Sequence, residues 1–287
     1  MSHPARARSA VLDPGAARAP ISDKEFAQFQ RFIHETAGIS LSAGKRQLVA
    51  GRLAKRLQQL GLPSYGAYFS YLATGGAPDE VQTAVDLLTT NETRFFREPK
   101  HFDLLRDLAS AARGKACSFR VWSAASSTGE EPFSIAMVLA DRLGGGPWQV
   151  LASDISMRVL ARAQRGHYPL ERAAQIPPGY LKRFCLRGLG PQAGTFLIER
   201  SLRSRVQFQQ INLNASLPDL GQFDVIFLRN VMIYFNDVTK RQVVARLLAT
   251  LKPHGHLMIG HSESLHGITD AVEAVAPTVY RKVPEGG

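Results

Sequence analysis

Polar side chains follow three apolar runs of the chain, each typical of a buried strand. Asp154 ends the first run, Asn212 follows the second, and Arg229 and Asn230 follow the third. If these strands are parallel, their carboxyl ends meet at one edge of a sheet, where α/β proteins bind ligands. Asp154 also comes 24 positions after Glu130 of a strand-to-helix turn, close to the separation of about 20 residues typical of an acidic side chain that binds ribose hydroxyls. The spacing indicates a nucleoside ligand, although Asp154 can equally cap the helix expected to begin near Met157.

The strand-to-helix turn is built from small residues. It lies within Trp122-Ser-Ala-Ala-Ser-Ser-Thr-Gly-Glu-Glu-Pro-Phe-Ser, where small side chains let a ligand approach the backbone. The dinucleotide fingerprint G-x-G-x-x-G is absent, and an acidic Glu130 would repel a pyrophosphate. We therefore expect a ligand without phosphate at this point. An ordinary tight connection between strand and helix is the alternative.

No motif for a catalytic nucleophile or a metal accompanies these side chains. The Ser-Ser-Thr of the turn has no histidine nearby in sequence, and G-x-S-x-G is missing. The eight histidines form no H-E-x-x-H pair, and Cys117 and Cys185 give neither a zinc spacing nor a disulfide framework. We expect no metal, a structural role for His261 at a strand end, and chemistry that needs no enzyme nucleophile.

The elements that must position these residues fall into two groups. Helical spacing predicts a helix that begins at the capping box Ser22-Asp-Lys-Glu25, followed by helices over 43–60, 64–72, 79–88 and 101–112. From Phe119 onward, strands over 119–124, 149–153, 205–211, 223–228 and 256–261 alternate with helices over 131–143, 157–165 and 238–251. This alternation predicts a doubly wound α/β sheet.

The distribution of these elements along the chain predicts its division into domains. We expect a disordered basic tail over 1–20, an all-helical domain over 21–88, a linker over 89–100 and an α/β domain over 101–287. The stretch 168–204 is rich in Gly and Pro and interrupts the alternation, so we expect it to form a small inserted β subdomain.

Length and charge limit the class of protein. The 287 residues are 45% hydrophobic and carry a formal net charge of +11, which suits a globular protein with an acidic partner. No apolar run approaches the roughly 20 residues of a membrane span, and residues 1–20 lack the apolar core of a secretory signal. We expect a cytoplasmic monomer that does not insert into membranes.

Five motifs together closely resemble the chemotaxis-receptor glutamate methyltransferases, the CheR family, over nearly all of residues 21–283. They are Thr89-Thr-Asn-Glu-Thr-Arg-Phe-Phe-Arg-Glu, the turn motif from Trp122, Ala152-Ser-Asp-Ile-Ser, Arg229-Asn-Val-Met-Ile-Tyr-Phe and Gly260-His-Ser-Glu-Ser. The resemblance implies a Rossmann-like domain that binds S-adenosylmethionine and releases S-adenosylhomocysteine. It also implies that the linker contributes to the cofactor site and that the helical domain closes over it.

The resemblance carries site residues over to matching positions. It implies cofactor contacts by Asn91, Thr93, Arg97, Glu130, Asp154, Asn212, Leu213, Arg229 and Asn230. Arg97 suits the methionine carboxylate, and Glu130 is preferred over the adjacent Glu131. Tyr234 is expected near the transferred methyl group as the catalytic residue. A receptor glutamate is already ionised at neutral pH, so it can attack the methyl group without a general base.

Two surfaces are candidates for binding a methyl-accepting chemotaxis receptor. The helix over 43–60 carries Lys45, Arg46, Arg52 and Arg56 with no acidic residue after Lys45, and we expect it to dock against the acidic methylation helices of the receptor. A solvated surface helix is the alternative. The β subdomain resembles the one with which some family members hold a peptide from the receptor's C-terminus. A simple surface hairpin is the alternative there.

Two other functions compete with receptor methylation. A nucleic-acid methyltransferase would also explain the positive charge, but the Asp/Asn-Pro-Pro-Tyr and Pro-Cys motifs of such enzymes are absent, so we expect no nucleic-acid partner. A receptor-binding module without catalysis is the second alternative. The presence of Asn91, Thr93, Arg97, Asp154 and Arg229 argues against loss of the cofactor site.

Overall fold

The computed structural model describes residues 20–74 and 78–283. The tail expected over 1–20 lies outside this part of the chain except for Pro20. The described residues divide into two compact units, one of residues 20–32 and 41–88 and the other of residues 33–40 and 89–283.

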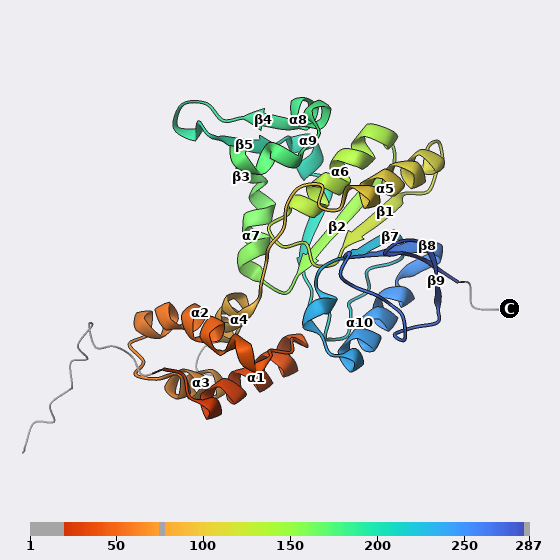
Figure 1. Cartoon of the computed structure of the whole chain (residues 1–287). Coiled ribbons are helices and arrows are strands. Elements are labelled where there is room, and N and C mark those ends of the chain that lie inside the picture. The colour runs from red at the N-terminus through yellow and green to blue at the C-terminus, as the bar shows by residue number, and fades with distance from the viewer. Residues whose placement is uncertain (1–19, 75–77, 284–287) are drawn as a thin grey trace, which may run out of the picture. The chain divides into compact units, whose positions relative to one another are not determined.

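The first unit is helical (Figure 1). Its elements are α1 (Asp23–Ala37, whose last turn belongs to the second unit), a 3₁₀ helix (Ala43–Lys45), α2 (Arg46–Gln59), α3 (Tyr65–Ala73) and α4 (Pro78–Leu88). The predicted capping box is confirmed, because the Glu25 amide donates to Ser22 Oγ at 3.3 Å and the Ser22 amide donates to Glu25 Oε2 at 2.9 Å. The apolar stripe of α2 is buried, as its spacing predicted, through Val49, Leu53 and Leu57.

The charged side chains of α2 differ from the expected docking face. Arg56 forms an ion pair with Glu80, which is 4% exposed and also accepts a hydrogen bond from Tyr68 Oη at 2.6 Å. Arg52 donates to Leu88 O at 2.7 Å, and Arg46 pairs with Asp23. Arg56 is therefore a structural residue of this unit and not a free docking charge. We correct the expected role of Arg56 as a docking residue, because its charge is paired with buried Glu80. Replacing Arg56 by glutamate would place a like charge beside Glu80.

A seven-stranded sheet forms the centre of the second unit, in the order β6-β2-β1-β7-β8-β10-β9. The pairs from β6 to β8 are parallel, whereas β10 is antiparallel to both neighbours. The strands are β1 (Phe119–Ser123), β2 (Trp148–Asp154), β6 (Val206–Gln210), β7 (Phe223–Leu228), β8 (Leu251–Ile259), β9 (Val272–Ala276) and β10 (Val279–Lys282). The predicted doubly wound sheet is confirmed, and its order reverses between β1 and β7.

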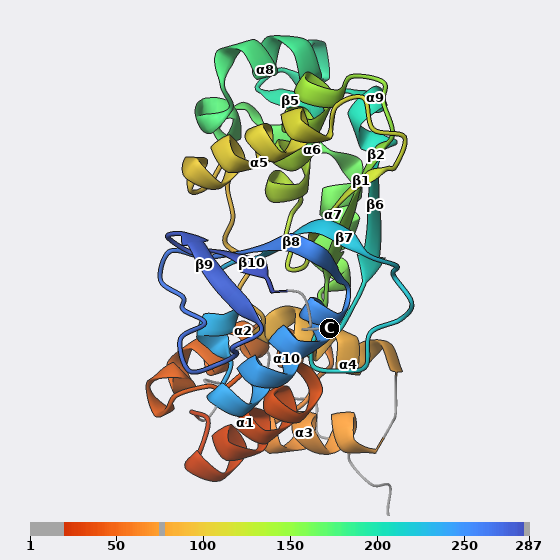
Figure 2. The same ribbon diagram turned by 90° about the vertical axis from the view of Figure 1, so that its right-hand side faces the viewer.

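Helices cover both faces of this sheet (Figure 2). Helices α5 (Pro99–Ala112) and α6 (Glu130–Leu143) pack on one face against side chains such as Val121 and Val225. Helix α10 (Asp237–Ala249) packs on the other face against Trp122 and Ile226. Successive strand residues thus point to opposite cores. Helix α7 (Met157–Arg165) follows β2 and contacts β2 and β6.

A second, three-stranded sheet in the order β3-β5-β4 lies within the stretch expected to form the inserted subdomain. Its strands are β3 (His167–Pro169), β4 (Cys185–Arg187) and β5 (Thr195–Ile198), accompanied by α8 (Pro178–Phe184), α9 (Arg200–Arg203) and 3₁₀ helices (Leu170–Gln175 and Gly190–Gln192). Both β3 and β4 pair only with β5 among the described strands, so each leaves one edge of the sheet unpaired.

The sequence missed β9 and β10. Strand β9 is almost entirely exposed and contains alanine and glutamate, so it lacks the apolar alternation by which a strand is recognised. No helix among residues 20–74 and 78–283 is both long and apolar enough to cross a bilayer.

Candidate functional site

A cavity opens at the carboxyl ends of four neighbouring strands of the second unit. Its walls come from the segments after β1, β2, β6 and β7, together with the stretch 89–97, and it encloses about 830 Å³ including its open mouth. The order of the sheet reverses at β1 and β7, and α/β proteins bind their ligands at this switch point. A second cavity, near Cys117, Asp224 and His254, lies at the amino ends of the strands. The first cavity is therefore the candidate site.

Most of the predicted cofactor contacts come together in this cavity. The predicted residues among its lining are Asn91, Thr93, Arg97, Asp154, Asn212, Leu213, Arg229, Asn230 and Tyr234. They come from parts of the chain far apart in sequence, and the parallel strands bring them together. The docking candidates Lys45, Arg46, Arg52 and Arg56 belong to the other unit and do not line the cavity.

The structure brings Glu131 to the cavity in place of Glu130, which the sequence analysis preferred. Glu131 lines the cavity, whereas Glu130 is 1% exposed and points elsewhere. The Glu130 carboxylate accepts a hydrogen bond from Thr128 Oγ1 at 2.6 Å and lies 3.4 Å from Arg172 Nη1. Both residues begin α6, where neighbouring side chains point about 100° apart. Only one of them can face the cavity, and the packing of α6 on the sheet determines which.

Arg229 binds two carboxylates, Glu131 of the cavity wall and Glu98, which does not line the cavity. Its side chain is 2% exposed, with Nη2 at 3.0 Å from Glu98 Oε2 and Nη1 at 3.0 Å from Glu131 Oε2. Arg229 also donates to Arg97 O, and Glu131 accepts from Ser123 Oγ at 2.7 Å. Burial raises the pKa of Glu131, and Arg229 offsets part of that rise. The guanidinium charge is thus paired within the protein, and Arg229 holds the Glu131 carboxylate in place.

Arg97 is the other arginine of the cavity wall. Its side chain is 32% exposed, and its nearest carboxylate oxygen, Glu98 Oε1, lies 4.0 Å away. Its Nη1 donates to Glu92 O at 3.3 Å. The Glu98 oxygen is too far from Arg97 for a hydrogen bond. Arg97 is therefore better placed than Arg229 to bind an anionic ligand group.

Asp154 orients the loop that follows β1. Its Oδ2 accepts from the Ser127 amide and its Oδ1 accepts from the Ser156 amide, both at 2.9 Å. Helix α7 is capped by Ser156, whose Oγ accepts from the Val159 amide at 3.4 Å. The alternative role of Asp154 as the cap of this helix is therefore wrong. Its carboxylate, 8% exposed, lines the cavity.

Ser127 was missed as a lining residue. It adopts a left-handed φ of 48°, and its Oγ donates to Asn91 O at 2.7 Å. It therefore joins the stretch 89–97 to the loop after β1. The positive φ and the bond to Asn91 both depend on tertiary structure. The small residues of the turn were the only signal in the sequence.

Asn212 and Leu213 form another part of the wall. Asn212 Nδ2 donates to Thr36 O at 2.6 Å, and its Oδ1 accepts from the Asn214 amide at 2.9 Å, so the side chain is fixed at both ends. Leu213 is joined by apolar lining residues that the sequence analysis missed, Ala37, Ile39, Ile155, Ile211, Val231 and Phe235. A largely apolar wall with a few oriented polar groups is typical of a small-molecule site.

Glu263 holds the segment that carries Asn230 and Tyr234, through the amides of Asn230 and Ile233. Asn230 has a left-handed φ of 57°, which asparagine tolerates, and its amide donates to Glu263 Oε2 at 2.9 Å. A Cβ on Gly260 would lie 2.4 Å from Asn230 Nδ2, so glycine is required there. Tyr234 ends the 3₁₀ helix Met232–Tyr234, and its carbonyl accepts from the Ser40 amide at 2.7 Å.

The fold and the cavity define a doubly wound α/β protein with a candidate ligand site at the switch point of its sheet. Comparison with models of protein families agrees with this fold and identifies the family. Residues 24–89 match the CheR methyltransferase all-alpha domain, and residues 91–281 match the CheR methyltransferase SAM binding domain. The chain belongs to the CheR methyltransferase family, and its α/β unit is an S-adenosylmethionine-binding methyltransferase domain.

Curated relatives support this membership. The chain is 45% identical over 260 residues to chemotaxis protein methyltransferase 2 of Pseudomonas aeruginosa, covering 90% of this chain and 92% of that protein. It is 43% identical over 266 residues to the chemotaxis protein methyltransferase of Escherichia coli, covering 92% of each. Among solved structures, it is similar to the glycopeptide N-methyltransferase MtfA complexed with S-adenosylmethionine, with 18% identity, a TM-score of 0.35, and coverage of 64% of this chain and 59% of that one.

Proposed function

We propose that this protein transfers a methyl group from S-adenosylmethionine to glutamate side chains of chemoreceptors and forms glutamate methyl esters. The curated relatives are chemotaxis protein methyltransferases, which supports a chemoreceptor as the substrate. The observation that carries the choice of glutamate is the chemistry of the cavity wall. None of the described residues that line it is a histidine, lysine or cysteine.

A carboxylate nucleophile suits such a wall. A glutamate side chain, with a pKa near 4.3, is ionised at neutral pH, whereas an amine would first have to lose a proton to a base. When bound, the cofactor supplies a methyl group on a positively charged sulfur, and the glutamate oxygen forms the new C–O bond as the C–S bond breaks. The protein's task is to bind and align the two reactants.

The lining residues can hold the cofactor in one orientation. Asp154 would accept hydrogen bonds from the ribose hydroxyls, Arg97 would bind the methionine carboxylate, and the apolar wall around Leu213 would contact the adenine. Glu131, fixed by Arg229, would attract the positively charged amino group. Tyr234 would lie near the transferred methyl group and limit the approach of the substrate glutamate.

The chemical stability of the product tests the proposal. After incubation of a chemoreceptor cytoplasmic fragment with radiolabelled S-adenosylmethionine and this protein, we expect the label on the receptor to be released as methanol in mild alkali, because esters hydrolyse in base. A fragment whose methylation-site glutamates are replaced by alanine is the control and should remain unlabelled. Label that survives alkali would contradict glutamate methylation. Label on added nucleic acid would favour the nucleic-acid alternative, and binding without transfer would favour a non-catalytic module.

The remaining positive charge in and just before α2 supports a docking role for this surface. Lys45, which ends the 3₁₀ helix before α2, is exposed, and Arg46 and Arg52 of α2 are half-buried. Because Arg56 is bound to Glu80, Lys45→Glu is a cleaner probe of receptor docking than a change at Arg56. We propose that this surface contributes weakly and in a salt-dependent way, as exposed charges do.

The inserted subdomain supports a second contact, with a peptide at the receptor's C-terminus. Strand β4 leaves an edge to which an extended peptide could add, and Leu186 on it and Leu189 beyond it are 54% and 78% exposed. Deleting residues 188–194, which connect β4 to β5, would also remove the bond from the Leu170 amide to Gly194 O at 2.8 Å, so a point change is preferable.

We expect Leu186→Asp to weaken binding to a receptor that carries the C-terminal peptide, because an exposed apolar contact is lost and a carboxylate must be desolvated. The affinity for S-adenosylmethionine should not change. Affinities for receptors with and without the peptide, measured by calorimetry, provide the comparison. If the unchanged protein binds the two receptors equally, the subdomain has no such role.

A further inference from the structure

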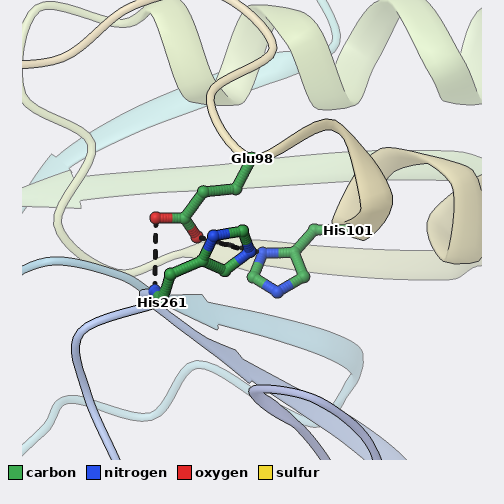
Figure 3. A group of neighbouring side chains, drawn as sticks. All are labelled: Glu98, His101 and His261. Atoms are coloured by element: carbon green, nitrogen blue, oxygen red, sulfur yellow. Dashed lines mark hydrogen bonds and ion pairs between the residues drawn. The ribbon is translucent and has the colours of Figure 1, made fainter.

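Three side chains with metal-binding atoms converge outside the cofactor cavity. Glu98 and His101 come from the start of α5, and His261 follows β8 (Figure 3). Their ligand atoms all lie within 4.8 Å of one another. His101 Nδ1 is 3.6 Å and His261 Nε2 is 3.8 Å from Glu98 Oε2. No motif in the sequence indicates this cluster, because His261 is far from the other two residues along the chain.

His101 Nδ1 faces the Glu98 carboxylate. Its Nε2 lies 2.9 Å from Thr278 Oγ1, and that hydroxyl donates its own hydrogen to Pro277 O at 2.7 Å. The Thr278 hydroxyl has a single hydrogen, so when it donates to Pro277 O, Nε2 is the donor and Nδ1 carries a lone pair. The His101 side chain is 2% exposed, and its Nδ1 has no hydrogen-bond partner.

In that tautomer the lone pairs of His101 Nδ1 and of the Glu98 carboxylate face each other at 3.6 Å and repel unless a cation lies between them. Neutral imidazole is the form that binds metal ions. The contact with Thr278 also fixes the ring and its tautomer, as outer hydrogen bonds do in metal sites.

We propose that Glu98, His101 and His261 form a binding site for a divalent transition-metal ion, of which zinc is the best match. The ligands are Glu98 Oε2, His101 Nδ1 and His261 Nε2, with water in the fourth position. Two imidazoles and one carboxylate are a ligand set typical of zinc. Bonds of about 2.0–2.1 Å in tetrahedral geometry place ligand atoms about 3.3 Å apart. Glu98 Oε2 is within a few tenths of an ångström of this separation from His101 Nδ1 (3.6 Å) and His261 Nε2 (3.8 Å), and the two ring nitrogens lie within 4.8 Å of each other.

The surroundings allow the ion to enter and limit its affinity. The His261 side chain is 53% exposed, so the site opens to solvent on that side. The His261 amide donates to Glu98 Oε1 at 3.2 Å and orients the carboxylate. Arg229 donates to the same oxygen that would bind the ion, and its positive charge opposes binding. We therefore expect an affinity in the micromolar range, below that of closed structural zinc sites.

Calorimetric titration of the untagged full-length protein with zinc chloride, after removal of metal by a chelator, tests the site. We expect one zinc ion per chain and at least a tenfold loss of affinity in His261→Ala. The matched control is His266→Ala, which removes another exposed histidine from the same loop and should bind as the unchanged protein does. Cobalt(II) should give the visible absorption of a four-coordinate ion in the unchanged protein and in His266→Ala, but not in His261→Ala.

His101→Gln is a second variant, because glutamine can still donate to Thr278 while Nδ1 is lost. Its zinc affinity should fall as in His261→Ala, with the circular dichroism spectrum as a check of folding. If His101→Gln does not fold, His261→Ala decides alone. The proposal is overturned if the unchanged protein binds no zinc, or if it and His261→Ala bind zinc with equal affinity.

Discussion

Replacing Arg229 by methionine is expected to lower the affinity for S-adenosylmethionine by about 100-fold and to destabilise the protein. The side chain is buried and is the shared partner of Glu98 and Glu131. Removing one partner of a buried ion pair typically costs about 3–5 kcal/mol, because the remaining charge stays buried without compensation. An affinity loss of about 100-fold corresponds to about 2.7 kcal/mol. Calorimetry measures the affinity, and thermal unfolding measures the stability.

Arg97→Met is the matched control, because Arg97 is a partly exposed arginine of the same cavity. It should weaken cofactor binding with little change in stability. Arg229→Lys keeps the charge but cannot bind both carboxylates in the forked geometry of a guanidinium. Its losses of cofactor affinity and of stability should therefore be smaller than those of Arg229→Met. Unchanged stability and affinity in both Arg229 variants would contradict the positioning role.

Asp154→Ala is expected to weaken S-adenosylmethionine binding at least tenfold. Two ribose hydrogen bonds of about 1–2 kcal/mol each would be lost. The structure adds a second cause, because Asp154 also binds the amides of Ser127 and Ser156 and thereby holds the loop after β1 in place. Calorimetric titration of the folded variant gives the affinity.

Ser156→Ala separates these effects from helix capping. It removes the side chain that caps α7 and leaves the Asp154 carboxylate in place, so it should cost about 1 kcal/mol of stability and little affinity. Equal cofactor affinities of Asp154→Ala and Ser156→Ala would contradict the role of Asp154 in binding the ribose.

The sequence predicted the strand ends of the site well, for a physical reason. Parallel strands bring their carboxyl ends to one edge whatever their order, so Asp154, Asn212 and Arg229 could be grouped before the order of the sheet was known. The grouping needed only the recognition of buried strands, and their apolar runs are long enough to recognise.

The direction of single side chains could not be predicted in the same way. The choice between Glu130 and Glu131 depends on the rotation of α6, which is fixed by its packing against α5 and the sheet. Arg56 was misassigned because its partner Glu80 comes from another helix, and a charge pattern on one helix does not reveal a buried partner on the next. The network of Arg229 with Glu98 and Glu131 was missed for the same reason.

Hydrogen–deuterium exchange with and without S-adenosylmethionine tests most directly whether the cavity at the switch point is the cofactor site. We predict slower exchange in the segments that line it, residues 89–97, 124–131, 211–213 and 229–235, and no change around Cys117 and His254 at the second cavity. Asp154→Ala should lose this protection at a cofactor concentration that saturates the unchanged protein. Protection confined to the region of Cys117 and His254, or no protection in the four segments at saturating cofactor, would contradict this account.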